Sequence, residues 1–326
     1  MKVLITGGAG FVGSHLAEAF LARGDEVVAL DSGPQAKVRH LLGQARFRLV
    51  VDSVMNPDIL DALAAHADVI YHLAGVVGVE HYVADPYQVL NVNINGTQNV
   101  LRAAFKHGRR VIFASTSEVY GRNPAVPWHE DADRVLGPST IDRWCYATSK
   151  AAGEHICLAY RRLGLPITIL RYFNVYGPHL DNLDVGRVIT IFMGQLLRGD
   201  PLTVIGDGGQ TRCFTFVTDA VQATVAAGVL AAAEGQVINV GSDEETSIRR
   251  LAELMIKIAG GPSTLRFVPQ EAVYGDGYED VRRRVPDVTR MHRLLGVRAT
   301  TPLAEGLART IAWFRAAAAD AAGGPP

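Results

Sequence analysis

Short apolar segments alternate with longer amphipathic stretches along the first half of the chain. Residues 1–6 form an apolar run rich in β-branched side chains, and an apolar-periodic stretch follows from Ser14 to Leu21. The first pattern is typical of a buried strand and the second of a helix. Further strands are expected at residues 26–30, 46–51, 69–73, 110–114 and 166–170. Regular alternation of the two patterns predicts an α/β fold built on a doubly wound parallel sheet.

The pattern becomes less regular after Pro178. Residues 214–217 and 236–240 have the pattern of segments that return to the first domain, so we expect a discontinuous domain boundary. One domain is expected at residues 1–177 plus about 214–244. A smaller α/β substrate domain is expected at 178–213 plus about 245–315. Residues 316–326 are rich in Ala, Gly and Pro and are expected to form a flexible tail.

A glycine-rich turn separates the first strand from the first helix. Gly7, Gly10 and Gly13 have the spacing G-x-x-G-x-x-G, which allows a tight turn and close approach of the backbone to a pyrophosphate at a helix N-terminus. Asp31 ends the second strand, where a carboxylate can bind the ribose hydroxyls of adenosine and would repel a 2′-phosphate. The combination predicts a Rossmann domain that binds NAD rather than NADP.

Other strand ends supply further cofactor candidates. Asp52 is a candidate for binding the adenine amino group, and the backbone at Ala74 and Gly75 would pass close to the cofactor. The residues expected to bind NAD are Gly7, Gly10, Phe11, Val12, Gly13, Asp31, Asp52, Ser53, Leu73, Ala74, Gly75, Asn93, Tyr146, Lys150 and Tyr172.

The strand at 110–114 leads into a segment that suggests catalysis. It is followed by Ser115-Thr116-Ser117-Glu118, and about thirty residues later Tyr146 precedes Lys150 by four positions. On a helix, residues four apart lie on one face. The ammonium, close to the positive ring of a bound NAD+, would stabilise a phenolate whose ordinary pKa is about 10. Such a pair can take the proton from a sugar hydroxyl while hydride leaves the same carbon.

Composition narrows the class of protein. The 326 residues are 48% hydrophobic and 20% charged, as in a soluble globular protein, and the net charge of −1 gives no reason to expect nucleic acid or a membrane as partner. The three cysteines have neither metal-ligand spacing nor a disulfide framework, so we expect no metal and a reducing, cytoplasmic setting. The first apolar run is too short for a signal peptide or a membrane span.

With these residues placed, the chain resembles an extended short-chain dehydrogenase/reductase of the NAD-dependent epimerase/dehydratase kind. Within it, four stretches resemble UDP-glucuronate decarboxylases, the UDP-xylose synthase-like enzymes. These stretches are Ser115 to Gly121, Arg143 to Tyr146, Leu180 to Leu183, and Tyr274 to Arg284.

The resemblance implies roles for particular residues. The catalytic positions that it implies are Thr116, Ser117, Glu118, Tyr146, Lys150 and Arg284. The implied substrate-binding positions are Glu80, Tyr82, Asn174, Arg187, Arg212, Tyr278 and Arg284. The implied reaction is oxidation of UDP-glucuronate at C4, loss of CO2 from the 4-keto acid, and re-reduction to UDP-xylose. The resemblance also implies a homodimer formed through helices at about 97–106 and 147–162.

Three other functions stay open on the sequence. Simple 4-epimerases generally have small residues where Glu118 stands, and 4,6-dehydratases usually carry Asp-Glu after the Thr, where Ser117 stands here. NAD-sensing proteins of this fold commonly lose the Tyr or the Lys, and this chain keeps both. Arg284 fits both diphosphate anchoring and carboxylate chemistry.

Two departures from the decarboxylase pattern bear on substrate and cofactor. Residues 75–82 lack the proline that decarboxylases commonly place ahead of the matching tyrosine, which leaves the sugar open. Residues 32–36 lack the aromatic and basic side chains common after the acidic residue. Loosely held NADH would allow release of some UDP-4-keto-pentose.

Overall fold

The computed structural model describes residues 1–326 except 181, 270–271, 273–280 and 324–326. Its centre is a seven-stranded sheet in the order β11-β6-β5-β4-β1-β2-β3, and every adjacent pair is parallel. The strands are β1 Lys2–Thr6, β2 Glu26–Asp31, β3 Phe47–Val51, β4 Val69–His72, β5 Arg110–Thr116, β6 Ile167–Tyr172 and β11 Val237–Val240. The strand order reverses beside β1, as in a doubly wound sheet, so the predicted fold class is confirmed.

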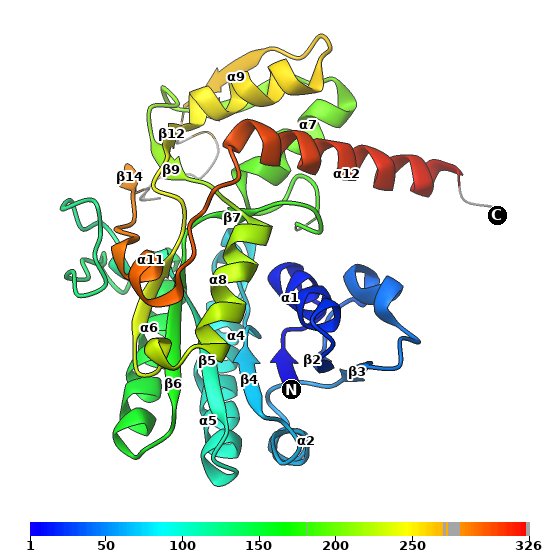
Figure 1. The fold of residues 1–326 in the computed structure, drawn as a ribbon. Helices are drawn as coiled ribbons and strands as arrows, with labels where there is room; N and C mark the ends of the chain where they lie inside the picture. The colour runs from blue at the N-terminus through cyan, green and yellow to red at the C-terminus, as the bar shows by residue number, and fades with distance from the viewer. Residues whose placement is uncertain (181, 270–271, 273–280, 324–326) are drawn as a thin grey trace.

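Helices cover both faces of this sheet (Figure 1). Along β1, Val3 and Ile5 face one apolar cluster and Leu4 the other, because side chains alternate along a strand. The first cluster includes α1 (Phe11–Ala22), which packs on α8 (Val217–Val229). The opposite face carries three helices: α2 Pro57–Ala64, α5 Thr97–Lys106 and α6 Arg143–Arg162. Both faces are therefore buried, which explains the nearly continuous apolar character of the strands.

Smaller sheets build the part of the molecule beyond β6. β13 (Leu265–Val268) pairs with β8 (Leu202–Ile205), β10 (Thr215–Phe216) with β7 (Val175–Tyr176), and β9 (Thr211–Cys213) lies between β12 (Glu245–Ser247) and β14 (Arg283–Arg284). The remaining elements are η1 Ala36–Leu41, α3 Val79–Ala84, α4 Pro86–Asn91, η2 Val92–Gly96, η3 Ser117–Tyr120, α7 Val188–Arg198, η4 Ala231–Ala233, α9 Ile248–Ala259, α11 Thr289–Leu295 and α12 Leu303–Gly323. α9 packs on α7 and α12, whereas α11 packs on β11 and α8.

The C-terminal helix is longer than the sequence analysis predicts. α12 continues to Gly323, through most of the segment expected to be a flexible tail. The run of alanines explains the difference, because alanine is the strongest helix former and needs no tertiary contact to favour the helix. Among the described helices, none is both long enough and apolar enough to cross a membrane.

Candidate active site

A cavity of about 1030 Å³ opens at the carboxyl ends of the central strands. The glycine turn after β1 lines one end, and β9 and β14 line the other. Between them lie the catalytic candidates on η3 and α6. Ligands of open parallel sheets bind at this edge. The cavity therefore brings the two groups of sequence candidates into one continuous space.

Two glycines of the turn, Gly7 and Gly13, have no room for a side chain. Gly7 has φ +73°, and its N–H donates to the carbonyl of Leu30 at 2.8 Å. A Cβ added to Gly13 would lie 2.1 Å from the carbonyl oxygen of Gly7. Close approach of a ligand to bare backbone at the N-terminus of α1 is what a pyrophosphate requires, so these residues fit a dinucleotide.

Asp31 holds the glycine turn from the end of β2. One carboxylate oxygen accepts the N–H of Ala9 at 2.9 Å and the other accepts the N–H of Gly33 at 2.8 Å. Asp31 also lines the cavity, as do all the other expected cofactor residues except Asn93. A cofactor ribose would therefore meet a carboxylate that two backbone amides already orient.

Replacing Asp31 by Asn is expected to weaken NAD+ binding about tenfold and to narrow the preference over NADP+. The amide keeps the size of the side chain, but it cannot accept from both backbone amides, and it no longer repels a 2′-phosphate. Calorimetric titration of the purified variant with each dinucleotide checks this. An unchanged ratio of the two dissociation constants would contradict the assigned position.

Asn93 lies behind the cavity wall instead of in it. Its amide oxygen accepts the N–H of Val76 at 2.8 Å, and its amide nitrogen donates to the Val76 carbonyl at 3.1 Å and to the Ser149 hydroxyl at 3.0 Å. Ser149 donates in turn to the carbonyl of Tyr146 at 2.8 Å. Asn93 thus joins the loop after β4 to the helix that carries the tyrosine–lysine pair.

Tyr146 and Lys150 lie one turn apart on α6, both buried. The ring of Tyr82 stacks on that of Tyr146 with centroids 6.2 Å apart, and Thr116 hydrogen-bonds the phenol. Burial, reinforced by the charge of Glu118, raises the pKa of Tyr146 to about 12. In the protein without NAD+, Tyr146 is therefore a neutral phenol and not the phenolate that the sequence leads us to expect.

Lys150 loses its proton more readily than an exposed lysine does. Its Nζ donates to the carbonyl of Ala114 at 2.9 Å, and burial lowers its pKa to about 8. Since the ammonium sits in an apolar surrounding over the Phe113 ring, a nearby phenolate would be a favourable partner for it.

Glu118 is held between two buried guanidinium groups. Arg284 Nη1 donates to Oε1 at 2.5 Å, and Arg143 Nη2 lies 3.6 Å from Oε2. Burial alone would raise the pKa of Glu118, but the charges of Arg284, Arg143 and Arg212 outweigh it and leave the pKa lowered. Glu118 is therefore a carboxylate over the range in which proteins are normally stable.

Arg143, the first residue of a decarboxylase-like stretch, has a place in the site that its sequence motif did not predict. It precedes Tyr146 by three positions at the start of α6, lines the cavity and is 4% exposed. Residues three apart share a helix face, so its position relative to Tyr146 was a usable signal.

The substrate candidates are only partly brought together. Those that line the cavity are Tyr82, Asn174, Arg187, Arg212 and Arg284. Arg212 and Arg284 are paired residues on the adjacent strands β9 and β14. Glu80 is not among the lining residues, and Tyr278 lies outside the described residues. Further lining residues without a sequence signal are Gln195, Thr203, Asp207, Gln210 and Arg282.

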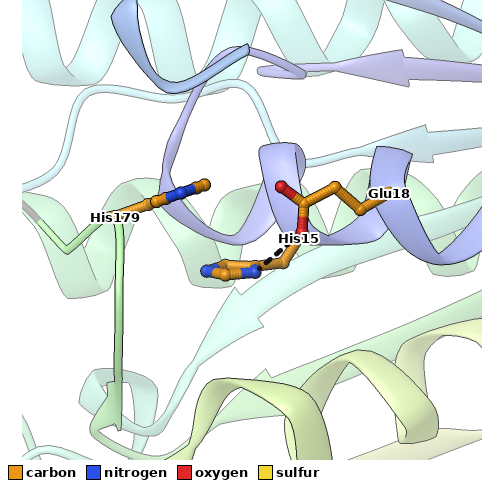
Figure 2. Close-up of side chains that lie close together, drawn as sticks. All are labelled: His15, Glu18 and His179. Atoms are coloured by element: carbon orange, nitrogen blue, oxygen red, sulfur yellow. Dashed lines mark ion pairs between the residues drawn. The ribbon is translucent and has the colours of Figure 1, made fainter. Parts of the chain in front are cut away.

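Among the described residues, one cluster has metal-ligand side chains close together: His15, Glu18 and His179 (Figure 2). None of the three lines the cavity. The His15 and His179 rings stack at 4.6 Å with 20° between their planes, so their in-plane lone pairs do not converge on one point. His15 also bonds the carbonyl of Pro178 at 2.8 Å. We interpret the cluster as the contact between α1 and the loop after β7.

The sequence model of the NAD dependent epimerase/dehydratase family matches residues 3–241. The chain belongs to this family. Its family description makes NAD the cofactor, in agreement with the fit of the glycine turn and with the expectation from the sequence.

Individual relatives in this family are similar over nearly the whole chain. A UDP-N-acetyl-alpha-D-glucosaminuronate decarboxylase of Bacillus cytotoxicus is 41% identical over 96% of this chain and 98% of its own length. UDP-glucuronic acid decarboxylase 1 of Xenopus tropicalis is 36% identical over 96% of this chain and 72% of its own length.

Solved structures of the same family superpose closely. A UDP-glucuronic acid 4-epimerase of Bacillus cereus, solved with UDP-glucuronic acid and NAD, has a TM-score of 0.87 and 33% identity, and the match covers 97% of this chain and 100% of that one. The resemblance read from the sequence is confirmed at the level of the family and of its decarboxylases.

Proposed function

We propose that the chain is an NAD-dependent UDP-uronate decarboxylase that converts UDP-glucuronate to UDP-xylose. The observation that carries this proposal is the positive charge around Glu118, in the part of the cavity lined by η3, β9 and β14. Three guanidinium groups, those of Arg284, Arg143 and Arg212, act on the one carboxylate of Glu118 strongly enough to lower its pKa. Such a positive potential attracts a C6 carboxylate and gives no advantage to a neutral hexose. The similarity to named decarboxylases supports the same assignment.

The residues of the site suit the proposed steps. NAD+, when bound, would supply the acceptor for the hydride that leaves sugar C4, a positive charge, and the hydride that is finally returned. Tyr146 takes the proton of the C4 hydroxyl while Thr116 hydrogen-bonds the same oxygen. The C5–C6 bond then breaks, CO2 leaves, and the electron pair enters the C4–C5 enolate.

Protonation of C5 completes the decarboxylation. Because Glu118 is ionised, we propose that it orders a water molecule with Arg284 and Ser117, and that this water delivers the proton to C5. The hydroxide that is left takes up a proton from solvent, so the reaction consumes one proton overall. Tyr146 returns its proton to the C4 oxygen in the last step.

The reaction itself is tested by incubating the purified protein with NAD+ and UDP-glucuronate. Release of CO2 with a UDP-pentose supports the proposal. Formation of UDP-galacturonate without CO2 would instead make the chain a 4-epimerase, like the structural neighbour from Bacillus cereus. Accumulation of NADH together with a UDP-4-keto-pentose would show that the keto intermediate leaves the enzyme.

The 2-acetamido uronate is the second candidate substrate. The relative from Bacillus cytotoxicus, 41% identical, is named for that sugar. The same assay with the 2-acetamido analogue gives its kcat/KM, and the larger kcat/KM identifies the substrate.

Replacing Glu118 by Gln is expected to shift the acid limb of C4 oxidation to lower pH by about one unit. The charge of Glu118 raises the pKa of Tyr146, so removing the charge lowers that pKa and makes the phenolate available at lower pH. The measurement is the pH dependence of NADH formation in a single turnover. A limb that stays in place or moves upward would contradict the coupling.

Assembly and location are part of the proposal. We propose that residues 1–177 with about 214–244 bind NAD and that 178–213 with about 245–315 bind the nucleotide sugar.

The half-exposed Phe105 ring packs on Tyr160 across α5 and α6, which supports a homodimer through these helices. Light scattering after size-exclusion chromatography tests the dimer. The three free cysteines agree with a cytoplasmic location.

A further inference from the structure

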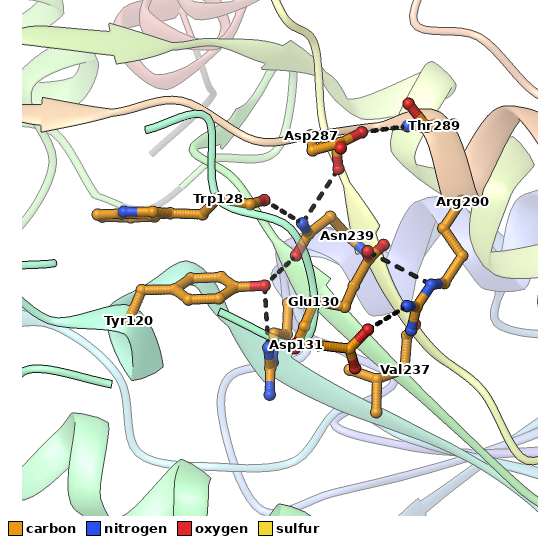
Figure 3. A network of polar contacts seen from close by, with 10 residues as sticks. Tyr120, Trp128, Glu130, Asp131, Val237, Asn239, Asp287, Thr289 and Arg290 are labelled. Carbon is orange, nitrogen blue, oxygen red and sulfur yellow. Dashed lines mark hydrogen bonds and ion pairs between the residues drawn. The ribbon is translucent and has the colours of Figure 1, made fainter. Parts of the chain in front are cut away.

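A buried polar network includes Tyr120 of η3 and meets at Asn239 (Figure 3). The Tyr120 hydroxyl donates to the amide oxygen of Asn239 at 2.7 Å. The amide nitrogen donates to the carbonyls of Trp128 at 2.8 Å and Asp287 at 3.1 Å. Asn239, Tyr120 and Trp128 are fully buried. We call Asn239 and its three partners, Tyr120, Trp128 and Asp287, the Asn239 junction.

The direction of each proton in the Asn239 junction is fixed by its neighbours. Arg171 donates to the Tyr120 oxygen at 2.9 Å, so the hydroxyl proton of Tyr120 is left for Asn239. Trp128 and Asp287 present carbonyls, which accept only. A neutral amide, with one acceptor and two donors, meets these three demands at once, and a carboxylate of the same size does not.

The Asn239 junction connects the two partners of the ion pair in the site. Tyr120 follows Glu118 by two positions on η3, and Asp287 follows Arg284 by three positions. The Trp128 backbone adds bonds to Val285 at 2.8 Å and Asp287 at 2.9 Å. The segments that carry Glu118 and Arg284 are therefore joined twice, once by the ion pair itself and once through Asn239.

The residues for hydride transfer are held by other contacts. Tyr146 and Lys150 depend on Ser149, Asn93 and the Ala114 carbonyl. Within the described part of the chain, no bond between these groups and Asn239 is found. Displacing the Asn239 junction should thus act directly on the Glu118–Arg284 ion pair. It reaches the hydride step only through Thr116, which accepts the N–H of Glu118, and through the charge of Glu118 on Tyr146, so NADH formation is compared at a pH above its acid limb.

We propose that Asn239 is a positioning residue that sets the geometry of the Glu118–Arg284 ion pair and thereby the rate of CO2 loss and C5 protonation far more than the rate of C4 oxidation. This role rests on the proposed decarboxylation.

The test compares Asn239→Asp with Thr168→Val. The first substitution keeps the volume of the side chain and removes both of its donors. Thr168 is an equally buried residue whose hydroxyl donates to the Ala233 carbonyl at 2.8 Å, away from η3 and β14, so Thr168→Val controls for the loss of a buried hydrogen bond elsewhere in the sheet. Each variant is mixed with NAD+ and the uronate that the wild type decarboxylates, and NADH and CO2 are followed with time.

We expect Asn239→Asp to slow CO2 release about tenfold while NADH forms at close to the wild-type rate, so that NADH accumulates. Tyr120→Phe, which removes one bond of the Asn239 junction and leaves Arg171 its bond to the Glu130 carbonyl, should show the same imbalance to a smaller degree and serves if the first variant does not fold. Thr168→Val should show none.

Equal slowing of NADH formation and CO2 release in the folded variants would overturn the proposal. So would a crystal structure of a folded variant in which Arg284 and Glu118 keep the wild-type distance. If the wild type released no CO2 from either uronate, the proposed function would fail, and the variant crystal structures would still decide whether Asn239 positions the ion pair.

Discussion

Replacing Tyr146 by Phe is expected to lower turnover at least about 100-fold, the size expected for the loss of a general base. The phenol is the acidic group that Thr116 hydrogen-bonds beside Lys150, and its oxygen is the only atom that the substitution removes. The Phe ring keeps the packing against Tyr82. Steady-state turnover with the uronate, together with the melting temperature, separates a lost base from a lost fold.

Tyr160→Phe is the matched control for this substitution. Tyr160 lies on the same helix and packs against Phe105, and its loss of a hydroxyl should leave turnover unchanged. Near-normal turnover of the Tyr146 variant, with NAD bound, would remove Tyr146 from the mechanism.

Replacing Arg284 by Gln is expected to lower kcat/KM for the uronate by about 100-fold. The substitution removes one of the three guanidinium groups proposed to attract the C6 carboxylate and leaves the partly buried Glu118 paired with the more distant Arg143. The pKa of Glu118 should rise as a result, because Arg284 contributes most to lowering it. Kinetics with the uronate and the corresponding neutral UDP-hexose measure the effect, and binding of the neutral sugar should change little.

The neighbouring Arg283 supplies the control. Its side chain is half exposed and pairs with Glu245 at 2.8 Å, so Arg283→Gln should cost little in stability or activity. Equal losses in the two variants would mean that Arg284 acts only through the fold of β14.

The central sheet was predictable because its strands are buried on both faces and are separated by helices. The ends of these strands then placed Asp31, Thr116 and Glu118 correctly at one edge. Arg143 was within reach of the same reasoning, since it shares a helix face with Tyr146.

Other features depend on contacts that no local pattern records. Asn239 meets Tyr120, which is 119 positions earlier in the chain, and Asp287, which is 48 positions later. Asn93 has a side chain that could contact a cofactor, but its amide is hydrogen-bonded to Val76 and Ser149. Residues 316–323 continue α12, which the alanine run favours, although the Gly and Pro residues at the end of the sequence predict a flexible tail.

The parallel pairing of β9 with β14 fixes the distance between the backbones of two arginines of the site. Arg212 and Arg284 are direct partners in the register, so their backbones lie about 4.8 Å apart and their side chains leave the same face. Backbone hydrogen bonds set this spacing, whatever side chains surround it. A slip of one residue would turn one guanidinium to the opposite face, so the parallel register keeps both cations at the cavity.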